Sequence, residues 1–188
     1  MGRPAPLPQD AKAPTDPVIT VQRIWPDDWR ILRDLRLASL ADAPYAFTSS
    51  VDREASFAEA TWRQRLAGDP SFAAFDGDQA IGLAGGVPGR PGPGVVRELV
   101  GMWVAAPYRR RGVSRMLFEA VATWATEQGA TTLTLGVTEG NHGARAAYLR
   151  MGLRPTGVTE PVWNDPTRKI EILGVDLPTP GRDVSPGR

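Results

Sequence analysis

Residues 95–104 read VVRELVGMWV, a long and mostly apolar run that is typical of a buried strand. Pro107 and an arginine-glycine loop follow, and apolar residues then recur at spacings of three and one over 113–124, as on one face of a helix. Residues 131–137 read TTLTLGV, a second strand entered through Gly129, which suits a helix C-cap. Strand, helix and strand in this order predict two parallel strands joined by a right-handed crossover.

The segments on both sides of this unit predict more of the same sheet. Before it, the patterns indicate a strand at 18–21, a helix opening at 25–28, a helix at 56–67 and a hairpin around 76–78. After it, they indicate a helix at 141–151 and two closing strands at 153–158 and 169–177. We therefore expect an α/β fold with a mixed, mostly antiparallel central sheet of about 6–7 strands and helices on both faces.

The length of 188 residues suits one domain. Residues 1–17 contain five prolines and residues 178–188 are equally poor in large apolar side chains, so we expect a disordered leader and a disordered tail around a folded domain at 18–177. No segment has the length and apolarity of a signal peptide or a membrane-spanning helix. The expected location is cytoplasmic, without a membrane partner.

The composition excludes several classes of site. The sequence has no cysteine and one histidine, which rules out disulfides, zinc–thiolate and iron–sulfur sites, a cysteine nucleophile and a multi-histidine metal site. No metal is therefore expected. Lys and Arg total 22 against 21 Asp and Glu, a net charge of +1, which argues against nucleic acid as the main partner.

The loop before the 113–124 helix has the features of an anion site. A helix N-terminus offers unpaired N–H groups and the positive end of the helix dipole, and three arginines add charge. Together they suit a pyrophosphate, although neither the Walker A nor the GxGxxG pattern is present. A solvated arginine cluster is the alternative. The residues of this loop are Arg109, Arg110, Arg111, Gly112, Val113, Ser114 and Arg115.

The pattern Arg109-x-x-Gly112-x-Ser114 resembles the Q/R-x-x-G-x-G/A signature of the GCN5-related N-acetyltransferase (GNAT) family. In that family the loop cradles the pyrophosphate of acetyl-CoA, so the resemblance implies that residues 109–115 bind this co-substrate. Ser114 stands where the family has Gly or Ala, a small residue that can still re-space the loop. The resemblance also implies the GNAT-like acyl-CoA N-acyltransferase fold.

A second segment is similar to the same family. Asn141-x-x-Ala144-x-x-x-Tyr148-x-x-x-Gly152-Leu153 matches its N-x-x-A-x-x-x-Y-x-x-x-G-F pattern, with Leu153 in place of Phe. The resemblance implies that Asn141 caps a helix and reaches the pantetheine arm of acetyl-CoA. It also implies that Tyr148 lies near the sulfur and protonates the departing thiolate. A tyrosine packed on an amphipathic helix is the alternative.

Glu98 is the one acid in the 95–104 strand, and strict alternation puts it on one face with Val96, Val100 and Met102. An acid among apolar neighbours has a raised pKa and can act as a general base. Several enzymes of the family carry a glutamate base eleven positions before the first residue of the loop motif, as Glu98 stands before Arg109. The alternative is a salt-bridged or water-exposed strand residue.

Other members of the family place a base five residues before the asparagine, but Gly136 occupies that position here. The resemblance implies that two loops border the acceptor site: the loop between the first two helices and the loop at 160–166. Six residues of these segments are candidate acceptor contacts: Asp42, Tyr45, Phe47, Asp52, Trp163 and Asp165.

The implied reaction is direct attack of a primary amine on acetyl-CoA in a ternary complex, because no cysteine or Ser–His pair suggests an acetyl-enzyme. Glu98 would take a proton from the ammonium, backbone N–H groups at Met102, Trp103 and Val104 would hold the thioester carbonyl, and Tyr148 would serve the thiolate. The acceptor would be a small-molecule or peptide amine, and the protein a monomer or homodimer. The alternatives are a non-catalytic acyl-CoA-binding or regulatory module of the same fold and a nucleic-acid-binding domain with an arginine patch.

Overall fold

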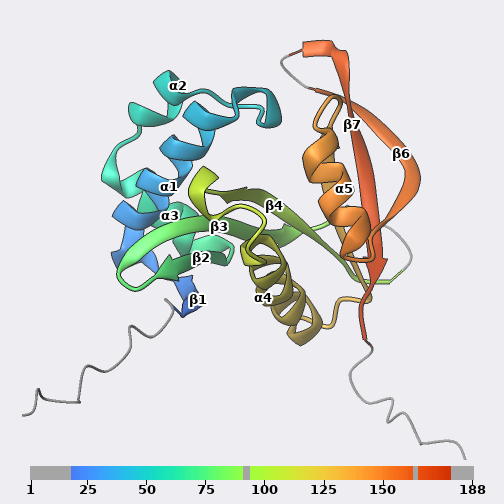
Figure 1. The fold of residues 1–188 in the computed structure, drawn as a ribbon, viewed down its shortest axis with the longest axis horizontal. Helices are drawn as coiled ribbons and strands as arrows, with labels where there is room; N and C mark the ends of the chain where they lie inside the picture. The colour runs from blue at the N-terminus through green and yellow to red at the C-terminus, as the bar shows by residue number, and fades with distance from the viewer. Residues whose placement is uncertain (1–17, 91–93, 163–164, 179–188) are drawn as a thin grey trace, which may run out of the picture.

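A computed structural model describes residues 18–90, 94–162 and 165–178 (Figure 1). One seven-stranded sheet has the order β1-β2-β3-β4-β5-β7-β6. Its strands are β1 (Ile19–Ile24), β2 (Ser71–Asp76), β3 (Gln79–Pro88), β4 (Val96–Val104), β5 (Thr132–Thr138), β6 (Arg154–Val162) and β7 (Asp165–Asp176). Every pairing is antiparallel except that of β4 with β5, which confirms the mostly antiparallel mixed sheet.

Helices cover both faces of the sheet, as expected. They are α1 (Trp29–Asp42), α2 (Val51–Ala55), α3 (Glu59–Gly68), α4 (Val113–Glu127) and α5 (His142–Arg150), with short 3-10 turns η1 (Pro26–Asp28), η2 (Pro44–Ala46) and η3 (Ala106–Tyr108). Ala73 packs in the cluster formed with α1 and α3, whereas its neighbour Ala74 packs in the cluster formed with α4. Neighbouring strand residues point to opposite faces, so these clusters are the two sides of the sheet. Figure 1 shows α5 beside β7.

The crossover from β4 through α4 to β5 agrees with the sequence, and it positions the site. The parallel ladder runs from the pair Val96–Thr132 only as far as Leu99–Leu135. Both strands continue beyond that pair, β4 to Val104 and β5 to Thr138. The sheet therefore opens into a V between the ends of these two strands.

A β-bulge in β4 corrects one expectation. Leu99 and Val104 pack in the same α4 cluster although they are five residues apart, which strict alternation forbids. The register with β3 shifts between the pairs Gly85–Val100 and Leu83–Trp103, and Gly101 has a φ of 66°. The bulge therefore inverts the alternation, and Met102 joins the α4 cluster on the face opposite Glu98.

Two boundaries also differ from expectation. The helix expected at 56–67 is α3, which begins later, at Glu59, because the chain is extended at Ala58. A short helix that the sequence did not predict, α2, precedes it, and Ser50 caps α2 by accepting from the Arg53 N–H. The closing strands are longer than expected, since β6 lies at the sheet edge, where Pro155 and Pro161 are tolerated.

The expected leader at 1–17 and most of the tail at 178–188 lie outside the described residues. Within the described part of the chain, no helix has the length and apolarity needed to cross a membrane.

Candidate functional site

A cavity of about 330 Å³ occupies the opening between the diverging ends of β4 and β5. It brings together four residues singled out from the sequence: Glu98 and Met102 from β4, Asn141 before α5, and Tyr148 within α5. Because of the bulge at Gly101, Glu98 and Met102 line this opening from opposite faces of β4.

Glu98 is half-buried in the wall of this cavity, opposite Val87 on β3 and Thr134 on β5. Burial raises the pKa of its carboxyl above the ordinary glutamate value, and the charge of Arg90 opposes that rise. A carboxylate that is partly desolvated binds a proton more readily than one in water. The environment therefore suits a base, as the sequence indicated.

Tyr148 lies on α5 and is 8% exposed. Burial raises the pKa of its hydroxyl to about 12. The ring packs in the same core cluster as Leu135 and Leu153, while the residue also lines the cavity. At neutral pH Tyr148 therefore keeps its proton and presents a hydrogen-bond donor rather than a base.

Asn141 caps α5, as expected, by accepting the Ala144 N–H on its Oδ1 at 3.3 Å. The capping bond uses the side-chain oxygen and does not involve the side-chain NH₂. Asn141 also lines the cavity. Gly136 also lines it, and a Cβ there would lie 2.7 Å from Ile170 Cγ2. The packing of β7 on β5 therefore leaves no room at this position for a side chain that could act as the catalytic base.

The loop before α4 has a backbone suited to close approach by a ligand. Arg110 and Gly112 both lie in the left-handed region, with φ of 62° and 85°. Gly112 is the N-cap of α4, and its carbonyl accepts the N–H groups of Arg115 and Met116. The N–H groups of Val113 and Ser114 precede these first helical bonds. A Cβ on Gly112 would meet nothing within 4 Å, so the position faces open space.

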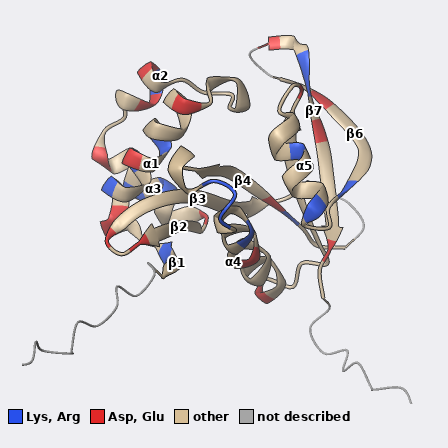
Figure 2. Ribbon diagram, in the orientation of Figure 1, with Lys and Arg blue, Asp and Glu red and all other residues tan. Residues whose placement is uncertain are grey.

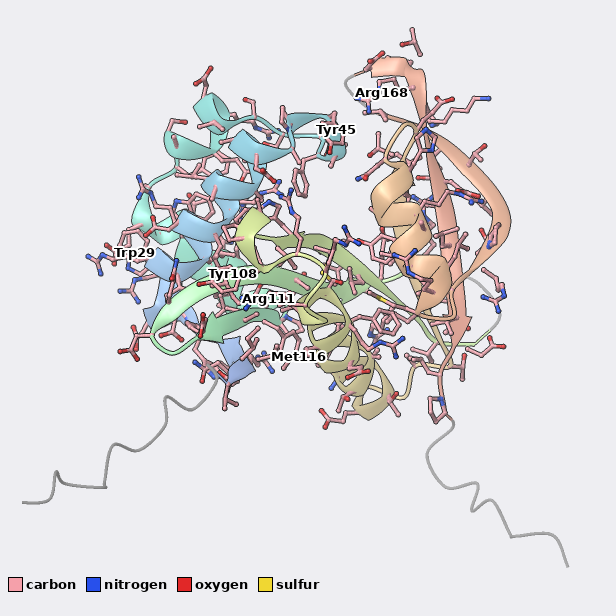
Figure 3. The ribbon with its side chains drawn as sticks, viewed as in Figure 1. Trp29, Tyr45, Tyr108, Arg111, Met116 and Arg168 are labelled. Carbon is pink, nitrogen blue, oxygen red and sulfur yellow. The ribbon has the colours of Figure 1, made fainter. Side chains whose placement is uncertain are left out.

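The arginines of this loop differ in what their side chains do (Figure 2, blue segment before α4). Arg109 donates from Nε to the Val104 carbonyl at 2.9 Å and forms an ion pair with Asp42. Arg110 is exposed, and Arg111 lies over the Tyr108 ring at 5.7 Å (Figure 3). Arg115 lies 3.8 Å from Glu119 on α4.

Asp42 joins this loop to α1 instead of facing an acceptor. Its Oδ2 accepts the Trp103 indole N–H at 2.9 Å and also the Arg109 guanidinium. The hydrogen bond from Trp103, with a smaller effect of Arg109, holds the pKa of Asp42 below its ordinary value. The side chains of Trp103 and Arg109 are therefore engaged within the protein.

The structure places the candidate acceptor contacts in different parts of the molecule. Phe47 lines the cavity, whereas Tyr45 is exposed and its carbonyl accepts from Arg168 Nη2 at 2.9 Å (Figure 3). Asp52 lies on α2, and Asp165 accepts from Thr167 at the start of β7. Trp163 lies outside the described residues.

Three charged residues of the cavity wall were missed by sequence reasoning: Arg36 from α1, Arg90 after β3 and Glu160 from β6. Arg90 and Glu160 form an ion pair across the opening. In the sequence these three residues are typical of charged surface positions. Their role in the cavity wall could not be predicted, because only the tertiary fold brings the three segments together. Among the described residues, no group of three or more His, Asp or Glu side chains could hold a metal ion.

The fold and the position of the cavity can be compared with those of known proteins. The profile of the acetyltransferase (GNAT) family matches residues 32–153. The chain belongs to the GNAT family, whose members transfer acyl groups to amines with acetyl-CoA as the general co-substrate.

Individual relatives support this assignment. The chain is 29% identical over 92 residues to N-acetyltransferase 8B of Rattus norvegicus, a match that covers 48% of this chain and 41% of that protein. The chain thus spans less than half the length of this curated relative. A GNAT-family acetyltransferase from Streptococcus pneumoniae superposes with a TM-score of 0.70 at 16% identity, covering 86% of this chain and all of that one. A GCN5-related N-acetyltransferase from Kribbella flavida gives 0.66 at 24%, covering 85% and 98%.

Proposed function

We propose that the protein transfers the acetyl group of acetyl-CoA to a primary amine by direct attack in a ternary complex. The observation that carries this proposal is the single cavity into which Glu98 and Tyr148 both open, between the diverging ends of β4 and β5. Acetyl-CoA would approach this opening with its pyrophosphate at the N-terminus of α4 and its thioester beside β4. Beyond Leu99, β4 does not pair with β5, so this part of the strand edge is open to an extended ligand.

Binding of the pyrophosphate rests on residues 110–115. The amides of Val113 and Ser114 and the exposed guanidinium of Arg110 supply donors and positive charge. Arg109 contributes by holding the loop through Val104 and Asp42. Asn141 supplies an amide to the pantetheine arm, which enters along the cavity wall.

Glu98 acts as the general base, directly or through a water. The attacking nitrogen must lose a proton for the C–N bond to form, and the raised pKa of Glu98 makes it a better acceptor than an exposed carboxylate. N–H groups at Met102 to Val104 stabilise the oxyanion as the carbonyl carbon becomes tetrahedral.

Tyr148 acts on the leaving sulfur as the C–S bond breaks. A thiol in water has a pKa of about 8.5, well below the value of about 12 for the Tyr148 hydroxyl. Full transfer of its proton to the thiolate is therefore uphill, and the hydroxyl stabilises the departing sulfur chiefly by donating a hydrogen bond. The ammonium loses two protons over the reaction: one protonates the CoA thiolate after the C–S bond breaks and the other passes to solvent, so CoA ends as the thiol and the acetylated amine is neutral.

The test is an acetyl-CoA-dependent thiol-release assay across a panel of amines, with the acetylated product identified by mass spectrometry. We expect thiol release to require an amine and product to form in equal amount. Binding of acetyl-CoA with no turnover on any amine would instead favour a non-catalytic acyl-CoA-binding module. A cytoplasmic location and a folded unit at 18–177 remain predictions.

A further inference from the structure

Arg36 lines the same cavity as the proposed catalytic residues Glu98 and Tyr148. It projects from α1, and its side chain is only 17% exposed. The Glu54 carboxylate binds one edge of its guanidinium, with Nε–Oε2 at 3.1 Å and Nη2–Oε1 at 2.9 Å. These two hydrogen bonds do not involve Nη1. The Arg36 Cζ atom lies 4.8 Å from the centroid of the Phe47 ring, and Phe47 also lines the cavity.

The cluster that holds Arg36 has an excess positive charge. Glu54 is 1% exposed, and it also accepts from Arg65 Nη1 at 2.8 Å. Burial opposes ionisation, but the bonds from Arg36 and Arg65 outweigh it and lower the pKa of Glu54 to about 2. One carboxylate therefore faces two guanidinium groups, so Arg36, Glu54 and Arg65 together carry one net positive charge; Asp69, an exposed residue, lines the neighbouring cavity with Arg36 and Arg65. A partly buried charge of this kind favours an anionic ligand.

The space beside Arg36 continues away from the reaction centre. A second cavity of about 360 Å³ shares Arg36, Val100 and Gly101 with the first. A Cβ on Gly101 would meet no atom within 4 Å, so open space lies beside the bulge that both cavities border. An acceptor with its amine at Glu98 can therefore extend past Arg36.

The charge of Arg36 is not used to adjust the base. The two causes of the Glu98 shift are burial and Arg90, and Arg36 is not among them. Arg90 in turn is paired with Glu160. Among the described cavity residues, Arg36 thus combines an orientation fixed by Glu54 with the net positive charge of its cluster.

We propose that Arg36, oriented by Glu54, binds an anionic group on the acceptor, so that the substrate is a primary amine that also carries a carboxylate or a phosphate. This inference rests on the proposed acetyl transfer and names the class of its acceptor. Arg36 is a specificity-determining residue, and Glu54 is a positioning residue that acts through it.

The test compares kcat/KM for acceptors matched in length. One pair is an ω-amino acid and its amide, and the other is an ω-aminoalkyl phosphate and the corresponding amino alcohol. We expect the protein to prefer an anionic member by about 10- to 100-fold, the range of a charge-assisted hydrogen bond. The better of the two anionic acceptors identifies carboxylate or phosphate as the recognised group.

Arg36→Gln should remove this preference by lowering kcat/KM for the anionic acceptor alone, with the neutral acceptor and the KM for acetyl-CoA unchanged. Arg33→Gln is the matched control, since Arg33 lies on the same helix and pairs only with its neighbour Asp34. It should keep the preference. Arg36→Lys retains the charge and a partner for Glu54, and should keep part of the preference if Arg36→Gln unfolds.

Equal turnover of anionic and neutral amines by the unaltered protein would overturn the inference while leaving acetyl transfer intact. An equal loss for both acceptors in a folded Arg36→Gln variant would overturn it as well, because it would show a purely structural role. No turnover with any amine would overturn the proposed function itself.

Discussion

Arg109 reaches back from the loop after β4 to form an ion pair with Asp42, the last residue of α1. The Trp103 indole donates to the same carboxylate. This contact joins the helix that borders the acceptor side to the loop that precedes α4. We infer that Asp42 holds the loop in place from outside the ligand site.

Replacing Asp42 by Asn should therefore weaken acetyl-CoA binding although Asp42 touches no proposed ligand atom. In a double-mutant cycle with Arg109→Gln, the two changes should be coupled by about 0.5–1 kcal/mol in unfolding free energy. Calorimetry of acetyl-CoA binding and chemical denaturation measure the two effects. Asp34→Asn is the control, since Asp34 is on the same helix and its side chain is 71% exposed. Additive effects of the two substitutions would show that the ion pair contributes nothing.

Arg90 lowers the pKa of Glu98, against the larger effect of burial. Arg90→Gln removes the positive charge, so the pKa of Glu98 should rise further. A base must be deprotonated to act, and the acidic limb of the kcat/KM profile should therefore move to higher pH. Glu160→Gln breaks the same ion pair but keeps the charge of Arg90, and it should not raise the limb. An unmoved limb in Arg90→Gln would mean that the titrating group is not Glu98.

The ionised carboxylate of Glu98 should also lower the stability of the folded state at neutral pH. Its pKa is raised on folding, so the folded state favours the protonated form, and its contribution to stability is lost as the pH rises through that pKa. Glu98→Gln should therefore raise Tm at pH 7 and have little effect at a pH below the ordinary glutamate value. Glu171→Gln should do the opposite at pH 7, because the bond from Arg145 holds the pKa of Glu171 low. Thermal unfolding of both variants at the two pH values checks these signs, and a lower Tm for Glu98→Gln at pH 7 would contradict them.

Tyr148→Phe keeps the buried ring and removes the hydroxyl. We expect kcat to fall by about 10²-fold, while acetyl-CoA affinity and Tm change little, because the hydroxyl acts on the departing sulfur. Burial raises the pKa of Tyr148 to about 12. Ionisation of this residue should therefore cause no loss of activity as the pH passes through the ordinary pKa of tyrosine. Steady-state kinetics with single-turnover controls measure the effect, and an unchanged kcat would show that the thiolate leaves without help from Tyr148.

Local patterns were sufficient to predict the strand–helix–strand unit and the hairpin between β2 and β3, because each depends on neighbours in sequence. The Asn141 cap was predicted from the family resemblance. The bulge at Gly101 was not predictable in the same way. Glycine in a strand permits a bulge without requiring one, and the side chain of Met102 changed faces as a result.

The parts of the site that the sequence did not reveal depend on contacts between distant segments. Arg36 and Glu54 are 18 residues apart, and Arg90 meets Glu160 across 70. Arg109 was predicted from its motif to bind the co-substrate, and the motif could not show that Asp42 occupies its side chain. Charged residues on amphipathic helices and loops give no local signal of the partner that folding provides.

The central claim, that Glu98 is the base of an acetyl transfer, is tested most directly by the pH dependence of kcat/KM in the unaltered protein and in Glu98→Gln. The account predicts a fall of about 10²–10⁴-fold in the variant, loss of the acidic limb and an unchanged KM for acetyl-CoA. Near-full activity of Glu98→Gln with an unaltered pH profile would contradict it and assign the proton to another group.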